Sequence, residues 1–149
     1  MRILSSLKTF SQSRLSWLLL LAFVVFFTLC AMYFQHVMLL APCVMCIYER
    51  IAMLGIGVAA LIGAIAPQNP VVRWLGFAAW GASSYKGLML AIEHVNYQFN
   101  PSPFATCDLF VTFPAWAPLN QWAPNLFEAY GDCSKVVWQF LTLSMPQWL

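Results

Sequence analysis

The chain has 149 residues, of which 62% are hydrophobic and 8% are charged. Soluble domains carry about three times that charged fraction, so the composition excludes an ordinary soluble protein and indicates a membrane protein. The formal net charge is only +2 and no block of Lys or Arg is present, which excludes nucleic acid as a partner.

The first apolar run predicts a membrane span over residues 15–34. Residues 15–33 carry no charge, and at about 1.5 Å per residue they reach about 28 Å, close to the hydrocarbon thickness of a bilayer. A cleaved signal peptide is the alternative. The run is longer than the usual hydrophobic region of such a peptide, and Phe34-Gln35-His36 is not a small-residue cleavage site.

Two further apolar runs, residues 47–66 and 71–92, predict a second and a third span. Pro67 and Pro70 separate them and break the helix, so the two spans are expected to form an antiparallel hairpin. The second span also contains small residues that allow close helix packing. These residues are Gly55, Gly57 and Gly63.

Residues 35–46 and 93–145 are predicted to be loops on one side of the membrane. The longer segment is rich in Pro and Trp, a composition that cannot continue a helix. Basic residues are more frequent on the other side, which places the amino terminus in the cytoplasm and both loops in the periplasm of a bacterium. The basic residues on the cytoplasmic side are Arg2, Lys8, Arg14 and Arg73.

We therefore expect one domain, residues 1–149, that passes several times through a bacterial inner membrane and contacts its lipid. The expected fold class is an all-α membrane protein, an antiparallel transmembrane helical bundle with a long irregular periplasmic loop.

Four cysteines fall in the two predicted loops as two pairs, Cys43 with Cys46 and Cys107 with Cys133. This placement predicts disulfide exchange between the pairs and electron delivery to an acceptor in the lipid. A structural staple is the alternative for the second pair, because disulfides persist in the periplasm. The short Cys-x-x-Cys loop gains little from cross-linking. A four-cysteine zinc site lacks its second tight Cys-x-x-Cys, so no metal is expected.

Cys46 is the predicted electron donor. If the second helix starts near this residue, free backbone N–H groups and the helix macrodipole favour its thiolate. Arg50 lies four residues later on the same helix face, where its guanidinium could stabilise the thiolate or donate to a carbonyl oxygen of a bound acceptor. The alternatives for Arg50 are snorkelling to the headgroups and pairing with a neighbouring carboxylate.

Two other reactive residue types receive no catalytic role. Cys30, within the first span, is predicted to be a small and unreactive core residue. His36 precedes Cys43 by seven residues, as a protease histidine could, but no Asn or Asp partner and no oxyanion site can be identified.

The order of these motifs resembles that of the DsbB family, inner-membrane disulfide oxidoreductases linked to quinone. The resemblance covers almost the whole chain. The segments that carry it are Gln35 to Leu40, Pro42-Cys43 with Cys46 to Arg50, Pro101 to Cys107, Gly131-Asp132-Cys133 and Met145 to Leu149.

The resemblance implies a relay of electrons through the two pairs. A reduced periplasmic oxidase of the DsbA type, a thioredoxin-fold protein, would attack the Cys107/Cys133 disulfide and form a mixed disulfide at Cys107. Cys43 and Cys46 would then reoxidise the loop pair. Cys46 would pass two electrons to ubiquinone, or to menaquinone without oxygen, through a thiolate adduct or a charge-transfer contact.

The same resemblance implies a quinone site, whose residues are Arg50, Leu90, His94, Met145 and Trp148. An imidazole at position 94 could donate to a quinone oxygen, and an indole could stack on a flat ring. The alternative for His94 is an interfacial histidine that is hydrogen-bonded to water.

The family has four spans, and residues 146–149 correspond to the beginning of the fourth. We therefore expect three spans in this chain. A second hypothesis stands beside the enzyme: an inactive truncated remnant, or a membrane interaction module, whose cysteine pairs are structural disulfides.

Overall fold

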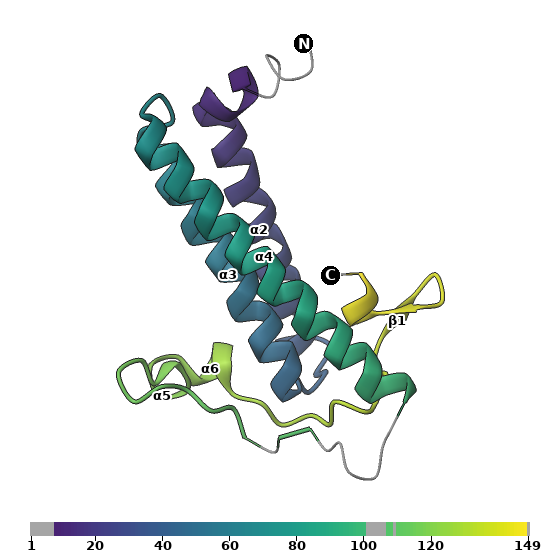
Figure 1. The fold of residues 1–149 in the computed structure, drawn as a ribbon. Helices are drawn as coiled ribbons and strands as arrows, with labels where there is room; N and C mark the ends of the chain where they lie inside the picture. The colour runs from purple at the N-terminus through teal and green to yellow at the C-terminus, as the bar shows by residue number, and fades with distance from the viewer. Residues whose placement is uncertain (1–7, 101–106, 109, 149) are drawn as a thin grey trace. The chain divides into compact units, whose positions relative to one another are not determined.

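Three long helices make up most of the computed structural model (Figure 1). The structure describes residues 8–100, 107–108 and 110–148. The helices are α2 (Arg14–His36), α3 (Val44–Ile65) and α4 (Pro70–Phe99). Within the described residues, strands are limited to one short hairpin, so the predicted all-α class is confirmed.

Local sequence explains how the helices are separated. Leu39 adopts a positive φ of 54°, in the left-handed region, where the chain turns between α2 and α3. Asn69 caps α4, because its side-chain oxygen accepts the N–H of Val71 at 2.9 Å. Pro70 occupies the first helical position, where a missing N–H is tolerated.

Two helix ends differ from the predicted ones. Helix α3 begins at Val44 and not at 47, and α4 ends at Phe99 and not at 92. Hydropathy falls at Glu93, which is where the third span was predicted to end, but backbone hydrogen bonding continues through polar residues. The longer α4 therefore carries His94 on a helix and not in a loop.

In the described part of the chain, α2 and α3 are long and apolar enough to cross a membrane. Only 11% of the apolar stretch of α2 is buried, and large side chains such as Phe23 and Phe26 are exposed. This exposure fits a helix surrounded by lipid. The third span remains a prediction, because α4 also contains Arg73, Lys86 and Glu93.

The chain forms two compact units, the first of residues 1–29 and 52–86 and the second of residues 30–51 and 87–149. In the first unit, Trp17 of α2 lies against Gly63 of α3, where an added Cβ would come within 2.3 Å of the indole ring. Val24 faces Gly57 in the same way. These two contacts make the parts of α2 and α3 in this unit antiparallel, and they confirm the predicted close packing at glycines.

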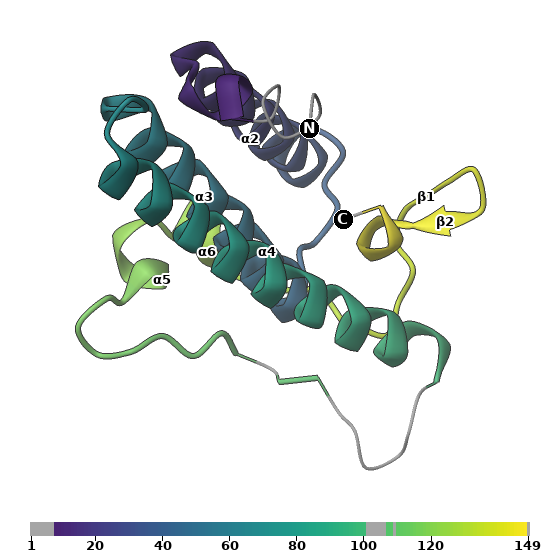
Figure 2. The same ribbon diagram turned by 45° about the horizontal axis from the view of Figure 1, so that its top comes forward.

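The second unit contains one end of each long helix and the long connection that follows α4. Its short elements are α5 (Leu119–Trp122), α6 (Pro124–Phe127), β1 (Gln139–Phe140), β2 (Leu143–Ser144) and the 3₁₀ helix η1 (Met145–Gln147). Strands β1 and β2 form an antiparallel hairpin (Figure 2). Its two turn residues, Leu141 and Thr142, both have positive φ, as a two-residue hairpin turn of this hand requires.

Candidate functional site: two cysteine pairs in one cluster

Cys43 caps the amino-terminal end of α3. The helix begins one residue later, and the Sγ atom of Cys43 accepts the backbone N–H of Cys46 at 3.2 Å. The sequence predicted that the sulfur of Cys46 lies over the free N–H groups at the start of the helix. In the structure the sulfur of Cys43 takes that position, because the helix starts earlier, at Val44. Hydrogen bonds from the side chain and the backbone of Cys46 lower the pKa of the Cys43 thiol, against the opposing effect of burial.

Backbone hydrogen bonds hold the second cysteine pair beside the first. The carbonyl oxygen of Pro42 accepts the N–H groups of Tyr130 and Gly131, both at 2.9 Å, and Cys43 forms a parallel bridge with Gly131. A Cβ at position 131 would lie 2.3 Å from the carbonyl oxygen of Ala41. Only glycine therefore permits this approach of the two chain segments.

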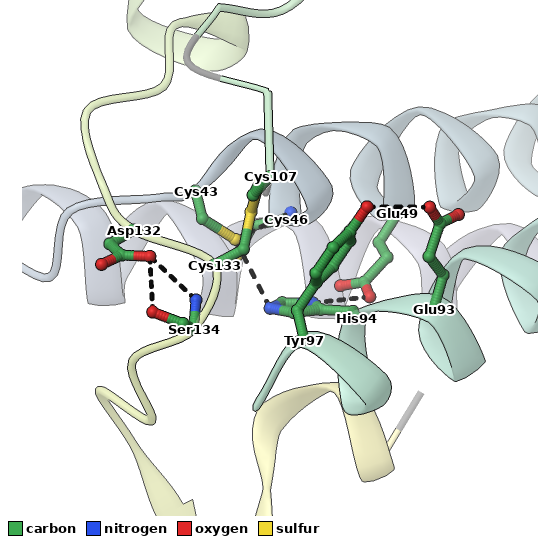
Figure 3. The surroundings of a disulfide bond; sticks show 10 residues. All are labelled: Cys43, Cys46, Glu49, Glu93, His94, Tyr97, Cys107, Asp132, Cys133 and Ser134. Carbon is green, nitrogen blue, oxygen red and sulfur yellow. Dashed lines mark hydrogen bonds and ion pairs between the residues drawn. A yellow bond between two sulfur atoms is a disulfide. The ribbon is translucent and has the colours of Figure 1, made fainter. Parts of the chain in front are cut away.

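Cys107 and Cys133 form a disulfide whose Cα atoms are 6.0 Å apart, while Cys43 and Cys46 are free thiols. All four sulfurs belong to one apolar cluster (Figure 3). Cys43 and Cys133 are among its buried residues, and Cys46 and Cys107 pack against them, partly buried. The structure thus brings both pairs together although 60 residues lie between Cys46 and Cys107.

Tyr48 attaches the segment after Cys107 to α3. Its phenol oxygen accepts the backbone N–H of Thr112 at 3.1 Å and lies 3.0 Å from the Thr112 hydroxyl. On the other side of the disulfide, Asp132 accepts hydrogen bonds from the N–H and hydroxyl groups of Ser134, which lower the pKa of its carboxyl group. Hydrogen bonds thus hold Thr112, after Cys107, and Asp132, before Cys133.

His94 lies between Cys43 and Glu49. Its Nε2 atom is 3.5 Å from the Sγ of Cys43, and its Nδ1 atom is 2.9 Å from a carboxylate oxygen of Glu49 (Figure 3). His94 is only 2% exposed and both ring nitrogens face protein groups, which does not fit the alternative of an interfacial histidine bonded to water. The family resemblance, in contrast, implied that this ring could donate to a quinone oxygen.

Arg50 is held by groups other than those expected. Its Nη1 atom donates to the side-chain oxygen of Gln35 at 3.0 Å and to the carbonyl oxygen of Leu126. Gln35 donates in turn to the carbonyl oxygen of Asn125 at 3.0 Å. Arg50 is buried, so it does not snorkel, and no carboxylate of the described residues pairs with it, since Glu49 bonds to His94 instead. Its Nε atom is buried without a partner among the described residues.

The other predicted residues occupy different places. Leu90 packs against the sulfur cluster, and Cys30 is a free, half-buried thiol of α2. Met145 begins η1, and the indole nitrogen of Trp148 donates to the carbonyl oxygen of Phe140 at 3.1 Å. The end of the long connection is part of an aromatic group made of Phe34, Trp138, Phe140 and Trp148.

The site can perform thiol–disulfide exchange, because free thiols lie against a disulfide in a buried cluster. Cys43, Cys46 and His94 also offer three possible metal-ligand atoms within 4.8 Å of one another. The four-cysteine zinc arrangement is not formed, because two of its sulfurs are bonded to each other.

Sequence reasoning gave no role to four residues that build this site: Gln35, Tyr48, Glu49 and Gly131. All four lie in the motifs that carried the family resemblance. Their position in those motifs was the available signal, but only the three-dimensional contacts reveal what each one does.

Comparison with known proteins agrees with the geometry. A family model described as disulfide bond formation protein DsbB matches residues 13–149. Proteins named disulfide bond formation protein B are similar over nearly the whole chain. The one from Vibrio alginolyticus is 76% identical over 149 residues, covering 100% of this chain and 90% of its own. The one from Aeromonas hydrophila is 56% identical over 143 residues, covering 96% of this chain and 83% of its own.

Proposed function

The chain belongs to the DsbB family of membrane disulfide oxidoreductases, and on that basis we propose that it reoxidises a periplasmic DsbA-like dithiol oxidase with quinone as the final acceptor. The observation that carries the proposal is the cluster in which Cys133 of the loop pair packs against Cys43 of the Cys-x-x-Cys pair. Electrons can pass between disulfides only when their sulfurs approach one another.

The first step is attack by a thiolate of the reduced partner on the loop disulfide. Cys107 is the expected target, because it is partly exposed while Cys133 is completely buried. The Cys107–Cys133 bond breaks and a mixed disulfide with the partner forms at Cys107. The second thiol of the partner then attacks this bond, which releases the oxidised partner and leaves Cys107 and Cys133 as thiols.

The second step passes the two electrons inward. The thiolate of Cys133 attacks the Sγ of Cys43 in a Cys43–Cys46 disulfide, and Cys46 leaves as a thiolate. Cys107 then attacks the Sγ of Cys133, which restores the loop disulfide and releases Cys43. The product state has a loop disulfide with two free thiols at the start of α3, as in the structure described here.

Quinone, when bound, supplies the acceptor for two electrons and two protons, and the residues present fit such a ligand. The buried Nε atom of Arg50 has no partner among the described residues, so it is a donor available to a carbonyl oxygen. Arg50 lies one helical turn after Cys46, which places the guanidinium and the sulfur on one face of α3. Leu90 would supply apolar wall, with Met145 and Trp148 as further predicted contacts. Ubiquinone and menaquinone share this chemistry.

We place the protein in the bacterial inner membrane with its amino terminus in the cytoplasm. The spans proposed are residues 15–34, 47–66 and 71–92, which leaves both cysteine pairs in the periplasm. The excess of basic residues before the first span and after Pro70 supports this orientation.

Turnover of the purified full chain tests the proposed function. The protein is supplied with a short-chain ubiquinone and a reduced DsbA-like oxidase, and the absorbance of the quinone is followed. Quinone reduction is expected, and Cys46→Ser is expected to abolish it. Cys30→Ser is the matched control, because it makes the same chemical change outside the sulfur cluster. A protein that stays inert with ample quinone and partner contradicts the proposal.

A further inference from the structure

His94 connects the sulfur of Cys43 to the carboxylate of Glu49 in one line of contacts. Nε2 faces the sulfur at 3.5 Å, and Nδ1 faces the carboxylate at 2.9 Å. Glu49 lies on α3, His94 lies on α4, and Cys43 caps the start of α3. A thiol, an imidazole and a carboxylate in this order form an arrangement that can move a proton to and from sulfur.

The carboxylate of Glu49 determines which ring nitrogen of His94 carries the proton and which is free to act as a base. An ionised Glu49 can only accept a hydrogen bond, so the proton of a neutral His94 is on Nδ1. The lone pair of Nε2 then points at Cys43. All three side chains are buried, with exposures of 6% for Glu49, 2% for His94 and 3% for Cys43, so bulk water does not take this role.

We propose that His94 is a catalytic residue that exchanges a proton with the Sγ of Cys43, and that Glu49 is the positioning residue that orients it. This inference rests on the proposed function and adds to it the route of one proton. Arg50 and Cys46 face the acceptor in that function, whereas His94 serves the sulfur that exchanges with the loop pair.

Such a group can act twice in each cycle. When Cys133 leaves Cys43 to re-form the loop disulfide, Cys43 departs as a thiolate, and protonated His94 can supply its proton. When Cys43 and Cys46 later form their disulfide, two electrons pass to the quinone and two thiol protons must leave. Nε2 of His94 takes the proton of Cys43, so the sulfur can attack as a thiolate.

The Cys43 environment contains several groups that titrate. Cys46 and Glu49 face it from α3, His94 faces it from α4, and Cys107 and Cys133 join them when the loop pair is reduced. A test must therefore separate the contribution of His94 from that of its neighbours, and single substitutions with matched controls can do this.

The test is the pH dependence of Cys43 alkylation in the fully reduced, quinone-free full chain, measured with iodoacetamide and peptide mapping, with a chelator present. We expect alkylation of Cys43 to reach its plateau well below the ordinary thiol pKa. In His94→Gln, the rate at about pH 6 should fall by about tenfold to a hundredfold and its rise should shift to higher pH, while the hydrogen bonds from Cys46 still keep the pKa of the Cys43 thiol below its ordinary value. Altered access to the sulfur would change the rate at every pH alike, so the shape of the profile isolates the base.

Glu49→Gln gives a second, independent outcome. The amide oxygen can still accept from Nδ1, but the negative charge is lost, so the profile should move part of the way toward that of His94→Gln. The controls are His36→Gln and Glu93→Gln, which make the same changes at exposed positions and should leave the profile unmoved.

Unchanged profiles in both His94→Gln and Glu49→Gln overturn the inference. If His94→Gln does not retain the Cys107–Cys133 pairing and the helical circular dichroism of the parent, Glu49→Gln decides alone. The measurement uses neither partner nor quinone. Absence of turnover in the parent would therefore refute the proposed function without affecting the alkylation result. Unchanged alkylation profiles would likewise overturn this inference without affecting the proposed function.

Discussion

The guanidinium of Arg50 donates to the side-chain oxygen of Gln35 across 3.0 Å, and both side chains are buried. Gln35 is also bonded to the carbonyl oxygen of Asn125, so it cannot turn away without breaking a second contact. Removing a hydrogen-bond acceptor from a buried arginine destabilises the folded protein. The remaining acceptors then set the orientation of the guanidinium. Gln35 thus fixes the direction in which Arg50 presents its other N–H groups.

Gln35→Leu is expected to raise the KM for quinone by about three- to tenfold, since one hydrogen bond to a charged group contributes about 1 kcal/mol or more. Arg50→His should raise it further. Exchange between Cys107 and the partner should change much less in both variants. Gln68→Leu, at an exposed position of the first unit, is the control. Steady-state kinetics with quinone varied at saturating partner gives the answer, and equal damage to both steps would refute the assignment.

Gly131→Ala is expected to slow transfer between the two cysteine pairs. The new Cβ would collide with the carbonyl oxygen of Ala41, and overpacking of this kind costs about 1–3 kcal/mol. If this free energy is added to the activation barrier for the approach of Cys133 to Cys43, the transfer rate drops by about tenfold or more. Rapid acid quenching followed by disulfide mapping, without quinone, measures this step.

Gly81→Ala is the matched control for that experiment, because nothing lies within 4 Å of a Cβ at position 81. It should transfer electrons at the parental rate. Reduction of the loop pair by the partner should also remain normal in Gly131→Ala, and slow reduction there would show that the substitution damages the whole loop.

Stability of the reduced protein should rise with pH through Cys43. Hydrogen bonds from Cys46 place the pKa of the folded-state thiol below its ordinary value. The ionised sulfur therefore stabilises the fold: this contribution is complete above the ordinary thiol pKa and is lost as pH falls through the lower pKa of the folded state.

The expected observation is a melting temperature that increases from about pH 6 to about pH 8, below the ordinary thiol pKa, more steeply in the parent than in Cys43→Ser. Cys30→Ser should keep the parental slope. A parental slope equal to that of Cys43→Ser, or smaller, would contradict the prediction.

Labelling in intact cells tests the proposed orientation. Gln68 lies in the short turn between α3 and α4, and Gln121 lies on α5, and both are exposed. A maleimide that cannot cross the inner membrane should react with Gln121→Cys and not with Gln68→Cys. Permeabilised cells should label both. The opposite pattern would place the cysteine pairs in the cytoplasm.

Much of this molecule could be predicted from the sequence because its signals are local. Long apolar runs predicted the helices, and the Cys-x-x-Cys motif with a later pair predicted the candidate chemistry. The start of α3 was harder, because a helix can begin anywhere within a turn of its first apolar residue. That small difference moved the helix cap from Cys46 to Cys43.

The contacts of Glu49 and Arg50 could not be predicted from the sequence. Glu49 and His94 are 45 residues apart, and Arg50 and Gln35 are 15 apart, on different helices in each case. Pairing with a neighbouring carboxylate was one alternative that the sequence left open for Arg50. The rotation of each helix about its axis decides instead, and it turns neighbouring side chains toward different partners.

The bonds from Tyr130 and Gly131 to Pro42 join main-chain atoms and contain no sulfur. Opening either disulfide breaks none of these bonds, so we expect the loop to keep its register beside the start of α3 throughout the proposed cycle. A freshly reduced Cys133 therefore remains next to its target and does not have to search for it. Each transfer of electrons between the two pairs is then an intramolecular reaction, and its rate is independent of protein concentration.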